Sequence, residues 1–222
     1  MNPDALVRLV SGCVLQYPGD HFHDELPRLR AALAGAPAEP AALLGAFLDH
    51  AESLDPIGLC AEYTSTFDTR NRRCLYLTWW ADGDTRRRGL SLVRLKRIYR
   101  DFGLEFAGEE LPDFLPVALE FAALREEAGT ELLQEHRAGL ELLRLALTES
   151  GSPYGRVLEA VCATLPGPSP ETRAEAKALA RSGPPQELVG AGSPLEPCEP
   201  FGPGIDLPAD LPWPTTPERR TA

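Results

Sequence analysis

The sequence lacks any uninterrupted apolar run long enough to span a bilayer, which argues against a transmembrane protein. The stretch from Met1 to Leu6 has neither a basic n-region nor an apolar h-region, so we expect no secretory signal. No segment alternates apolar and polar residues convincingly with the period of two that is typical of strands. These absences favour a cytoplasmic, helical protein, and 222 residues suffice for a single domain with a substantial core.

Paired cysteines and clustered metal ligands are also missing. The five cysteines are odd in number, scattered and never spaced as CxxC: Cys13, Cys60, Cys74, Cys162 and Cys198. Reduced thiols in the cytoplasm fit this pattern best. His21 and His23 are followed by Asp24 and Glu25, but no second cluster at zinc spacing accompanies them. We therefore expect no metal site.

Motifs of catalysis are absent as well. The sequence has no G-x-S-x-G elbow, no phosphate-binding loop of the Walker type and no G-x-G-x-x-G. The carboxylates of Asp82, Asp84, Asp113 and Glu120 could act as general acids or bases, but Asp84 and Asp113 stand where helices are expected to begin. Helix capping is the commoner role for such residues. The sequence therefore predicts neither an enzyme nor a bound cofactor.

Charge is strongly unbalanced, with 33 acidic against 22 basic residues and a net charge of −11. A nucleic-acid ligand is disfavoured because phosphate contacts need a basic surface, and anionic lipid would be repelled. The balance favours a basic partner, because complementary charge accelerates encounter and selects partners. A simpler interpretation remains open, in which negative charge only keeps the protein in solution.

Apolar residues recur with helical spacing along most of the chain. The expected helices cover about residues 2–17, 22–33, 40–54, 56–67, 85–102, 114–124, 130–147, 154–165 and 169–180. Asp84 or Thr85 is expected to cap the helix that Gly103 ends in a left-handed conformation. For residues 74–80 we favour a short helix over a strand, because a lone strand would leave its backbone groups unpaired.

The helix at residues 114–124 is expected to be central. With Asp113 as N-cap, Pro116 falls at the third helical position. Backbone N–H groups in this first turn have no partner within the helix, so the N–H that proline lacks is not missed. The apolar residues that follow cover more than half of the circumference. Composition then divides the chain into a helical domain, residues 1–182, and a tail, residues 183–222, rich in Pro, Gly, Glu and Asp. Such a tail buries too little apolar surface to offset its ordering entropy, so we expect it to be flexible.

Arginines crowd the start of the helix at residues 85–102. Guanidinium groups oppose the positive end of the helix dipole, so an acidic group is needed nearby. We hypothesise an internal charge network that orders the turn between Trp79 and Thr85, to which Asp68 or Asp113 could add. The residues assigned to this network are Asp82, Asp84, Arg86 and Arg87, with Arg88 beside them. The alternative is a solvated helix face, which suits most of these groups.

Four ordered blocks carry a resemblance to a known family: Tyr63-x-x-x-Phe67-Asp68, Leu75-Tyr76-Leu77-Thr78, Ala81-Asp-Gly-Asp-Thr-Arg-Arg-Arg-Gly89 and Glu110-Leu-Pro-Asp-Phe-Leu-Pro-Val-Ala-Leu-Glu-Phe121. Together they resemble the NarJ-type nitrate reductase assembly chaperones, relatives of the TorD-like chaperones of molybdenum enzymes. The resemblance runs from about residue 5 to 165. At residue 114 the family commonly has histidine, whereas this chain has phenylalanine, so a role in packing is expected there.

The resemblance implies an all-α, single-domain bundle of the TorD-like type without catalytic turnover. Such chaperones bind the basic N-terminal segment of the apo catalytic (alpha) subunit of respiratory nitrate reductase. They hold that subunit until the molybdenum cofactor is inserted, before membrane attachment. Three alternatives stay open: a chaperone for an S- or N-oxide reductase, a small helical nucleotide hydrolase and an acidic adaptor.

A groove between the helices at residues 56–67 and 112–124 is the predicted peptide site, because helix-in-groove recognition uses aromatic and aliphatic pockets. Nearby aromatics such as Tyr76 and Trp79 are expected mostly in the core, with some lining the groove. The predicted peptide-binding or groove-supporting residues are Tyr63, Phe67, Asp68, Asp113, Phe114, Leu115, Glu120 and Phe121.

Overall fold

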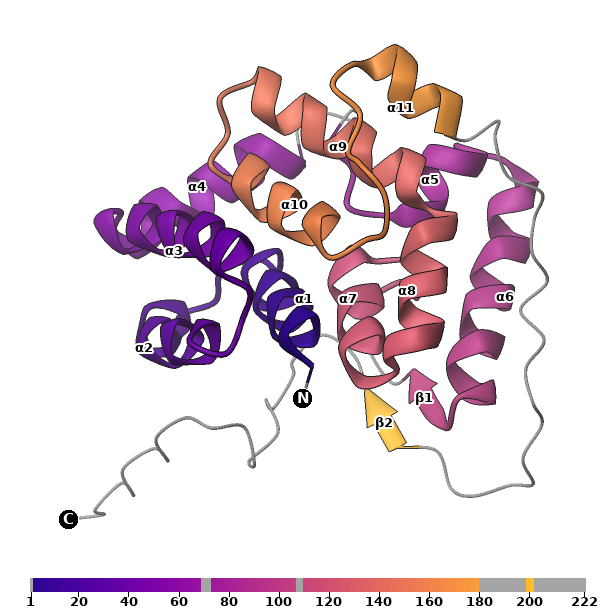
Figure 1. Cartoon of the computed structure of the whole chain (residues 1–222), viewed down its shortest axis with the longest axis horizontal. Coiled ribbons are helices and arrows are strands. Elements are labelled where there is room, and N and C mark those ends of the chain that lie inside the picture. Colours follow the sequence, from indigo (N-terminus) through magenta and orange to yellow (C-terminus); the bar gives the residue numbers. More distant parts are fainter. Residues whose placement is uncertain (1, 69–72, 107–109, 180–198, 202–222) are drawn as a thin grey trace.

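The computed structural model describes residues 2–68, 73–106, 110–179 and 199–201, and within them the fold is almost entirely helical (Figure 1). The helices are α1 (Pro3–Val14), α2 (Phe22–Leu33), α3 (Ala38–Ser53), α4 (Pro56–Phe67), α5 (Leu77–Asp82), α6 (Arg86–Asp101), α7 (Leu115–Leu124), α8 (Glu126–Glu135), α9 (Arg137–Glu149), α10 (Tyr154–Ala163) and α11 (Arg173–Leu179). The prediction of an all-α bundle is confirmed.

Helix α7 lies at the centre of the bundle, as its wide apolar arc predicts. Its residues from Leu115 to Ala123 are all buried, and it packs mainly against α1 and α8. Figure 1 shows α7 between α1 on one side and α8 on the other. Helix α1 is almost as deeply buried, so the two helices form the middle of the core around which the others are arranged.

A buried arginine joins three of these helices. Arg8 of α1 is 1% exposed, and its guanidinium donates to the carbonyl of Ala122 at 3.2 Å and to the carbonyl and hydroxyl of Thr164 at 3.1 Å each. Both carbonyls lie at the last turns of helices, where the helix itself supplies no donor. Arg8 therefore satisfies the ends of α7 and α10 while it fixes α1 between them.

Two helices occupy the span that we predicted as one. The expected helix at residues 130–147 is divided into α8 and α9 by His136, whose φ is −95° and ψ is 9°. A break of one residue leaves apolar spacing almost unchanged, so the sequence pattern does not reveal it. Arg137 then pairs with Glu141 at 3.4 Å and donates to the carbonyl of Gly167 at 2.9 Å, which ties the start of α9 to the loop after α10.

The fold also contains two short strands, contrary to prediction. Strand β1 (Leu104–Phe106) pairs in parallel with β2 (Glu199–Phe201), with Leu104 opposite Glu199. Three residues are too few to display an alternating pattern. The pairing also shows that part of the predicted tail contacts the helical domain through its backbone. The other tail residues, 183–198 and 202–222, lie outside the described residues.

Candidate functional site

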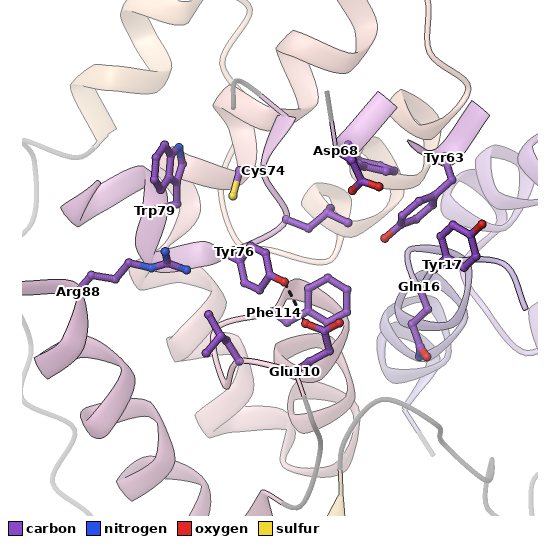
Figure 2. Close-up of a pocket in the computed structure, with 13 residues that line it drawn as sticks. Gln16, Tyr17, Tyr63, Asp68, Cys74, Tyr76, Trp79, Arg88, Glu110 and Phe114 are labelled. Atoms are coloured by element: carbon purple, nitrogen blue, oxygen red, sulfur yellow. Dashed lines mark hydrogen bonds between the residues drawn. The ribbon is translucent and has the colours of Figure 1, made fainter. Parts of the chain in front are cut away.

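A cavity of about 650 Å³ opens where α4, α5 and α6 approach the segment before α7 (Figure 2). It is lined by Gln16, Tyr17, Tyr63, Phe67, Asp68, Cys74, Leu75, Tyr76, Trp79, Arg88, Glu110, Leu111 and Phe114. We call this cavity the α4–α6 pocket. Its volume is typical of sites that admit a ligand or several side chains of a partner.

Aromatic rings form one wall of the α4–α6 pocket. Tyr63 packs against Phe67 with ring centroids 4.8 Å apart, and its hydroxyl donates to the carbonyl of Leu15 at 3.0 Å. Burial raises the pKa of Tyr63, so this hydroxyl remains a donor. Tyr17 meets Tyr63 edge-on at 5.5 Å and is 57% exposed. The first helix is expected to extend to about residue 17, but α1 ends at Val14, so Tyr17 lies beyond the helix.

The opposite wall depends on a short antiparallel contact that the sequence does not predict. Tyr76 and Phe114 form an isolated bridge, in which Leu77 donates to the carbonyl of Asp113 at 2.8 Å and Leu115 donates to that of Leu75 at 2.7 Å. Residues 74–76 are therefore extended, and the helix expected at residues 74–80 begins only at Leu77. The extended stretch is not a lone strand, because the segment before α7 pairs with its backbone.

Asp113 does not cap α7. The N-cap is Phe114, and no side chain caps that helix end. The carboxylate of Asp113 is instead fully buried and accepts from the backbone N–H and the hydroxyl of Thr78, at the start of α5. Its charge is balanced by Arg88, whose Nη2 lies 3.5 Å from Oδ2. Asp113 thus joins α5, α6 and the segment before α7 from inside the protein.

Arg88 is the arginine of the run that takes part in a charge network. Besides Asp113 it contacts Thr78, to whose hydroxyl its Nε donates at 3.3 Å. Its guanidinium also lies over the rings of Tyr76, at 5.6 Å, and Trp79, at 6.0 Å. These contacts hold the cationic group at the wall of the α4–α6 pocket (Figure 2).

The other residues assigned to the network do not form it. Asp82 accepts from the hydroxyl of Ser91 at 2.6 Å. Asp84, Arg86 and Arg87 are exposed, and no ion pair involves them within the described residues. The ion pair lies where the sequence predicts a charge network, and it includes Asp113, which the sequence allows as a possible addition. The arginine that takes part is Arg88 and not Arg86 or Arg87. The reason is that neighbours on a helix face different directions, and only Arg88 faces inward.

Acidic groups lie elsewhere on the α4–α6 pocket. Asp68 follows α4 and is exposed, and Glu110 accepts from the hydroxyl of Tyr76 at 2.9 Å. Burial, together with this hydrogen bond, raises the pKa of Tyr76. The ring of Tyr76 also packs on Phe114 at 5.4 Å, which agrees with the packing role expected where the family commonly has histidine. The pocket therefore combines an apolar floor with charges of both signs.

The structure brings half of the predicted peptide-binding residues to one pocket: Tyr63, Phe67, Asp68 and Phe114. The other half is buried in the core away from its wall: Asp113, Leu115, Glu120 and Phe121. The carboxylates of Asp113 and Glu120 cannot meet a partner in this conformation, so their assignment as direct contacts is corrected. Leu115 donates its backbone N–H to the carbonyl of Leu75, which lines the pocket, whereas Phe121 packs on Tyr99 and Phe102, which do not. The apolar pattern of the sequence gives no signal for the other lining residues, among them Gln16, Tyr17, Arg88 and Glu110.

Within the ranges that the structure describes, no group of three or more His, Cys, Asp and Glu side chains is placed to hold a metal ion. In the same ranges no helix is both long and apolar enough to cross a membrane. The described cysteines are free thiols, and burial raises the pKa of Cys13, which packs partly buried against the core, to about 12.

The all-helical bundle with a pocket between its helices has a counterpart among solved structures. The fold is similar to the crystal structure of a protein from Archaeoglobus fulgidus described as taking part in redox enzyme maturation, with a TM-score of 0.51 and 22% identity. That similarity covers 80% of this chain and 91% of the other, and it supports the fold alone.

Sequence comparison then identifies the family. The model of the nitrate reductase delta subunit family matches residues 30–159, and the chain belongs to this family. It is 33% identical over 156 residues to a nitrate reductase molybdenum cofactor assembly chaperone NarJ of Bacillus subtilis, covering 69% of this chain and 84% of the relative. It is 32% identical over 145 residues to NarJ of Escherichia coli K12, covering 64% and 61%.

A third relative shows that the same unit occurs inside a larger protein. The chain is 40% identical over 152 residues to the nitrate reductase-like protein NarX of Mycobacterium tuberculosis, where the match covers 68% of this chain but only 23% of NarX. The two NarJ relatives are named as assembly chaperones and not as catalysts. The chain therefore belongs to the family of the NarJ-type chaperones.

Proposed function

We propose that this chaperone binds the N-terminal segment of the apo catalytic (alpha) subunit of nitrate reductase in the α4–α6 pocket. The bound subunit is held competent for insertion of the molybdenum cofactor and is released to the membrane only afterwards. The site of action is the cytoplasm, where thiols such as Cys13 and Cys162 stay reduced.

The α4–α6 pocket is the observation that carries this proposal. It combines buried aromatic rings with exposed Tyr17 and with the carboxylates of Asp68 and Glu110, in a chain of net charge −11. A basic, partly apolar peptide would place its apolar side chains on the rings and its cations beside the carboxylates. The names of the two NarJ relatives support nitrate reductase as the partner enzyme.

Calorimetric titration of the whole chain with a synthetic peptide of that N-terminal segment tests the proposal. We expect saturable heat with the natural peptide and none with a scrambled peptide of the same composition. Tyr17→Ala should weaken binding about tenfold, because exposed tyrosines at a pocket edge are common hot spots. Ile57→Ala is the matched control, since Ile57 is 81% exposed but does not line the pocket.

Two outcomes would contradict the assignment. Equal heats for the natural and scrambled peptides would show that the chain does not recognise this N-terminal segment specifically. An effect of Ile57→Ala as large as that of Tyr17→Ala would move the site away from the α4–α6 pocket. Capture of the bound subunit from nitrate-respiring cells, with identification by mass, then decides which reductase is the partner.

A further inference from the structure

The α4–α6 pocket carries opposite charges at its two ends. Figure 2 shows Arg88 and Trp79 on one side, Asp68 with Tyr63 and Tyr17 on the other, and Glu110 between them. Arg88 comes from the first turn of α6, whereas Asp68 follows the end of α4. A symmetric apolar groove would accept a helix in either direction, but a groove with charged ends does not.

We propose that the α4–α6 pocket binds its peptide in one direction only, with the N-terminal turn of the bound helix beside Asp68 and its C-terminal end beside Arg88. Arg88 is then the residue that sets the polarity of the bound segment. This inference rests on the proposed function and adds to it the order of charges that the partner segment must have.

Arg88 retains a donor for this task. Its Nε donates to Thr78 and its Nη2 faces Asp113 at 3.5 Å, whereas its Nη1 makes no hydrogen bond to any described residue. The contacts with Tyr76 and Trp79 hold the guanidinium plane in place, so little side-chain entropy is lost when a ligand binds. The last turn of a helix exposes carbonyl groups that lack partners, and a guanidinium is well suited to meet them.

The opposite end favours a helix N-terminus for the same electrostatic reason. Asp68 is exposed at that end, so its carboxylate attracts the positive end of a helix dipole and any basic side chain on the first turn. Reversal would bring the partner's basic turn toward Arg88 and its carbonyl end toward Asp68. The recognised segment therefore has basic residues first, apolar residues at helical spacing next, and an uncharged or acidic end.

Paramagnetic broadening measures the direction of binding. The probe is the synthetic N-terminal peptide of the catalytic subunit, carrying a nitroxide at either end, added to the full chain labelled with ¹⁵N. We expect a C-terminal nitroxide to broaden the indole N–H of Trp79, assigned with Trp79→Phe, and an N-terminal nitroxide to broaden the side-chain amide of Gln16. The reverse pattern, or equal broadening from both labels, would overturn the inferred direction while binding itself persists.

A pair of variants tests the role of Arg88. Arg88→Gln alone leaves the buried Asp113 uncompensated, so the informative variant is the double substitution Arg88→Gln with Asp113→Asn, which keeps the interior neutral. We expect peptide affinity to fall about threefold and the difference between the two nitroxides to shrink. Arg87→Gln, on the exposed side of the same turn, is the control and should change neither.

The outcomes separate this inference from the proposed function. Loss of the orientation preference in the double variant supports Arg88 as the polarity-setting residue. An unchanged preference with unchanged affinity would overturn that role. Absence of any binding by the natural peptide to the unmodified chain would instead defeat the proposed function, and this inference with it.

Discussion

At the scale of single residues, the informative positions are polar groups inside the protein. Asp113 is fully buried, and its Oδ2 accepts from the backbone N–H and the hydroxyl of Thr78 and lies 3.5 Å from the guanidinium of Arg88, while its Oδ1 makes no hydrogen bond to a described residue. Burial of a carboxylate is costly unless such partners replace the water that it loses. Its role is to connect α5, α6 and the segment before α7, which together form one wall of the α4–α6 pocket.

Removal of Arg88 should therefore destabilise the fold. We expect Arg88→Ala to lower the free energy of unfolding by about 2 kcal/mol, because the carboxylate of Asp113 loses its counter-ion. The side chain of Arg88 is 20% exposed, so the cost falls below that of a fully buried pair. Urea denaturation measures the change, and Arg87→Ala should stay within about 0.5 kcal/mol of the unmodified chain. Equal losses for both variants would contradict the importance of the Asp113 pair.

His136, between α8 and α9, makes stability depend on pH. Burial lowers its pKa in the folded chain below the value of about 6.5 expected when unfolded. As pH falls below about 6.5 the unfolded state takes up a proton that the folded state refuses, so the free energy of unfolding decreases until the folded pKa is passed. His136→Gln should remove this part of the acid sensitivity between about pH 7 and pH 5.5 in urea titrations. His21, whose side chain is 85% exposed, is the control, and an equal effect of His21→Gln would contradict the prediction.

At the scale of secondary-structure elements, close helix contacts explain features that apolar periodicity does not predict. Helix α7 passes into α8 at Arg125, where φ is −132° and ψ is 79°, and the two helices then pack closely. A Cβ on Gly129 would lie 2.1 Å from the Cα of Ala122. Only glycine permits this approach, so a single residue sets the spacing of two central helices.

Gly129→Ala should be costly for that reason. The added methyl meets backbone rather than a flexible side chain, so α7 and α8 must move apart, and we expect a loss of about 2 kcal/mol or more in the free energy of unfolding. Gly89→Ala is the matched control, because Gly89 also lies within a helix but has no atom within 4 Å of an added Cβ. That variant should gain about 0.5 kcal/mol or more from helix propensity. Thermal denaturation of both compares them, and a neutral Gly129→Ala would refute the close-packing account.

At the scale of the whole molecule, the net charge of −11 and the site act together. Helices drawn from residues 3 to 163 enclose a core whose apolar side chains are almost all covered, while Tyr17 stays 57% exposed at the edge of the α4–α6 pocket. The surrounding negative surface attracts a basic segment over distances longer than any single contact. The pocket then selects by shape and by the placement of its charges.

Salt should separate these two contributions. Raising the salt concentration from about 0.1 M to about 1 M shortens the screening length from about 10 Å to about 3 Å, so peptide affinity should fall several-fold. The thermal midpoint of the chain should hold or rise, because screening reduces the repulsion among its own carboxylates. Calorimetry and thermal denaturation in the same buffers check both. An affinity that does not change with salt would indicate purely apolar binding.

Much of this molecule follows from local patterns in its sequence. Helices α2 and α4 begin and end at the predicted residues, Asn2 and Asp55 cap the helices that follow them, and Gly103 takes the left-handed conformation with φ of 77°. Capping, apolar spacing and positive φ are decided within a few neighbouring residues, so the sequence alone expresses them. The family resemblance likewise depends on ordered local blocks.

Tertiary structure decided what depends on contacts between distant segments. Three contacts join parts of the chain that are far apart in sequence: the extended pairing beside Phe114, the ion pair of Arg88 with Asp113, and the pairing of residues 199–201 with β1. The exposure of Tyr17 likewise depends on how the surrounding helices pack. Apolar periodicity tells which face of a helix is buried, but it does not tell which residue that face meets. The sequence by itself therefore determined the helices and the family. Packing of those helices against one another determined the pocket and its charges.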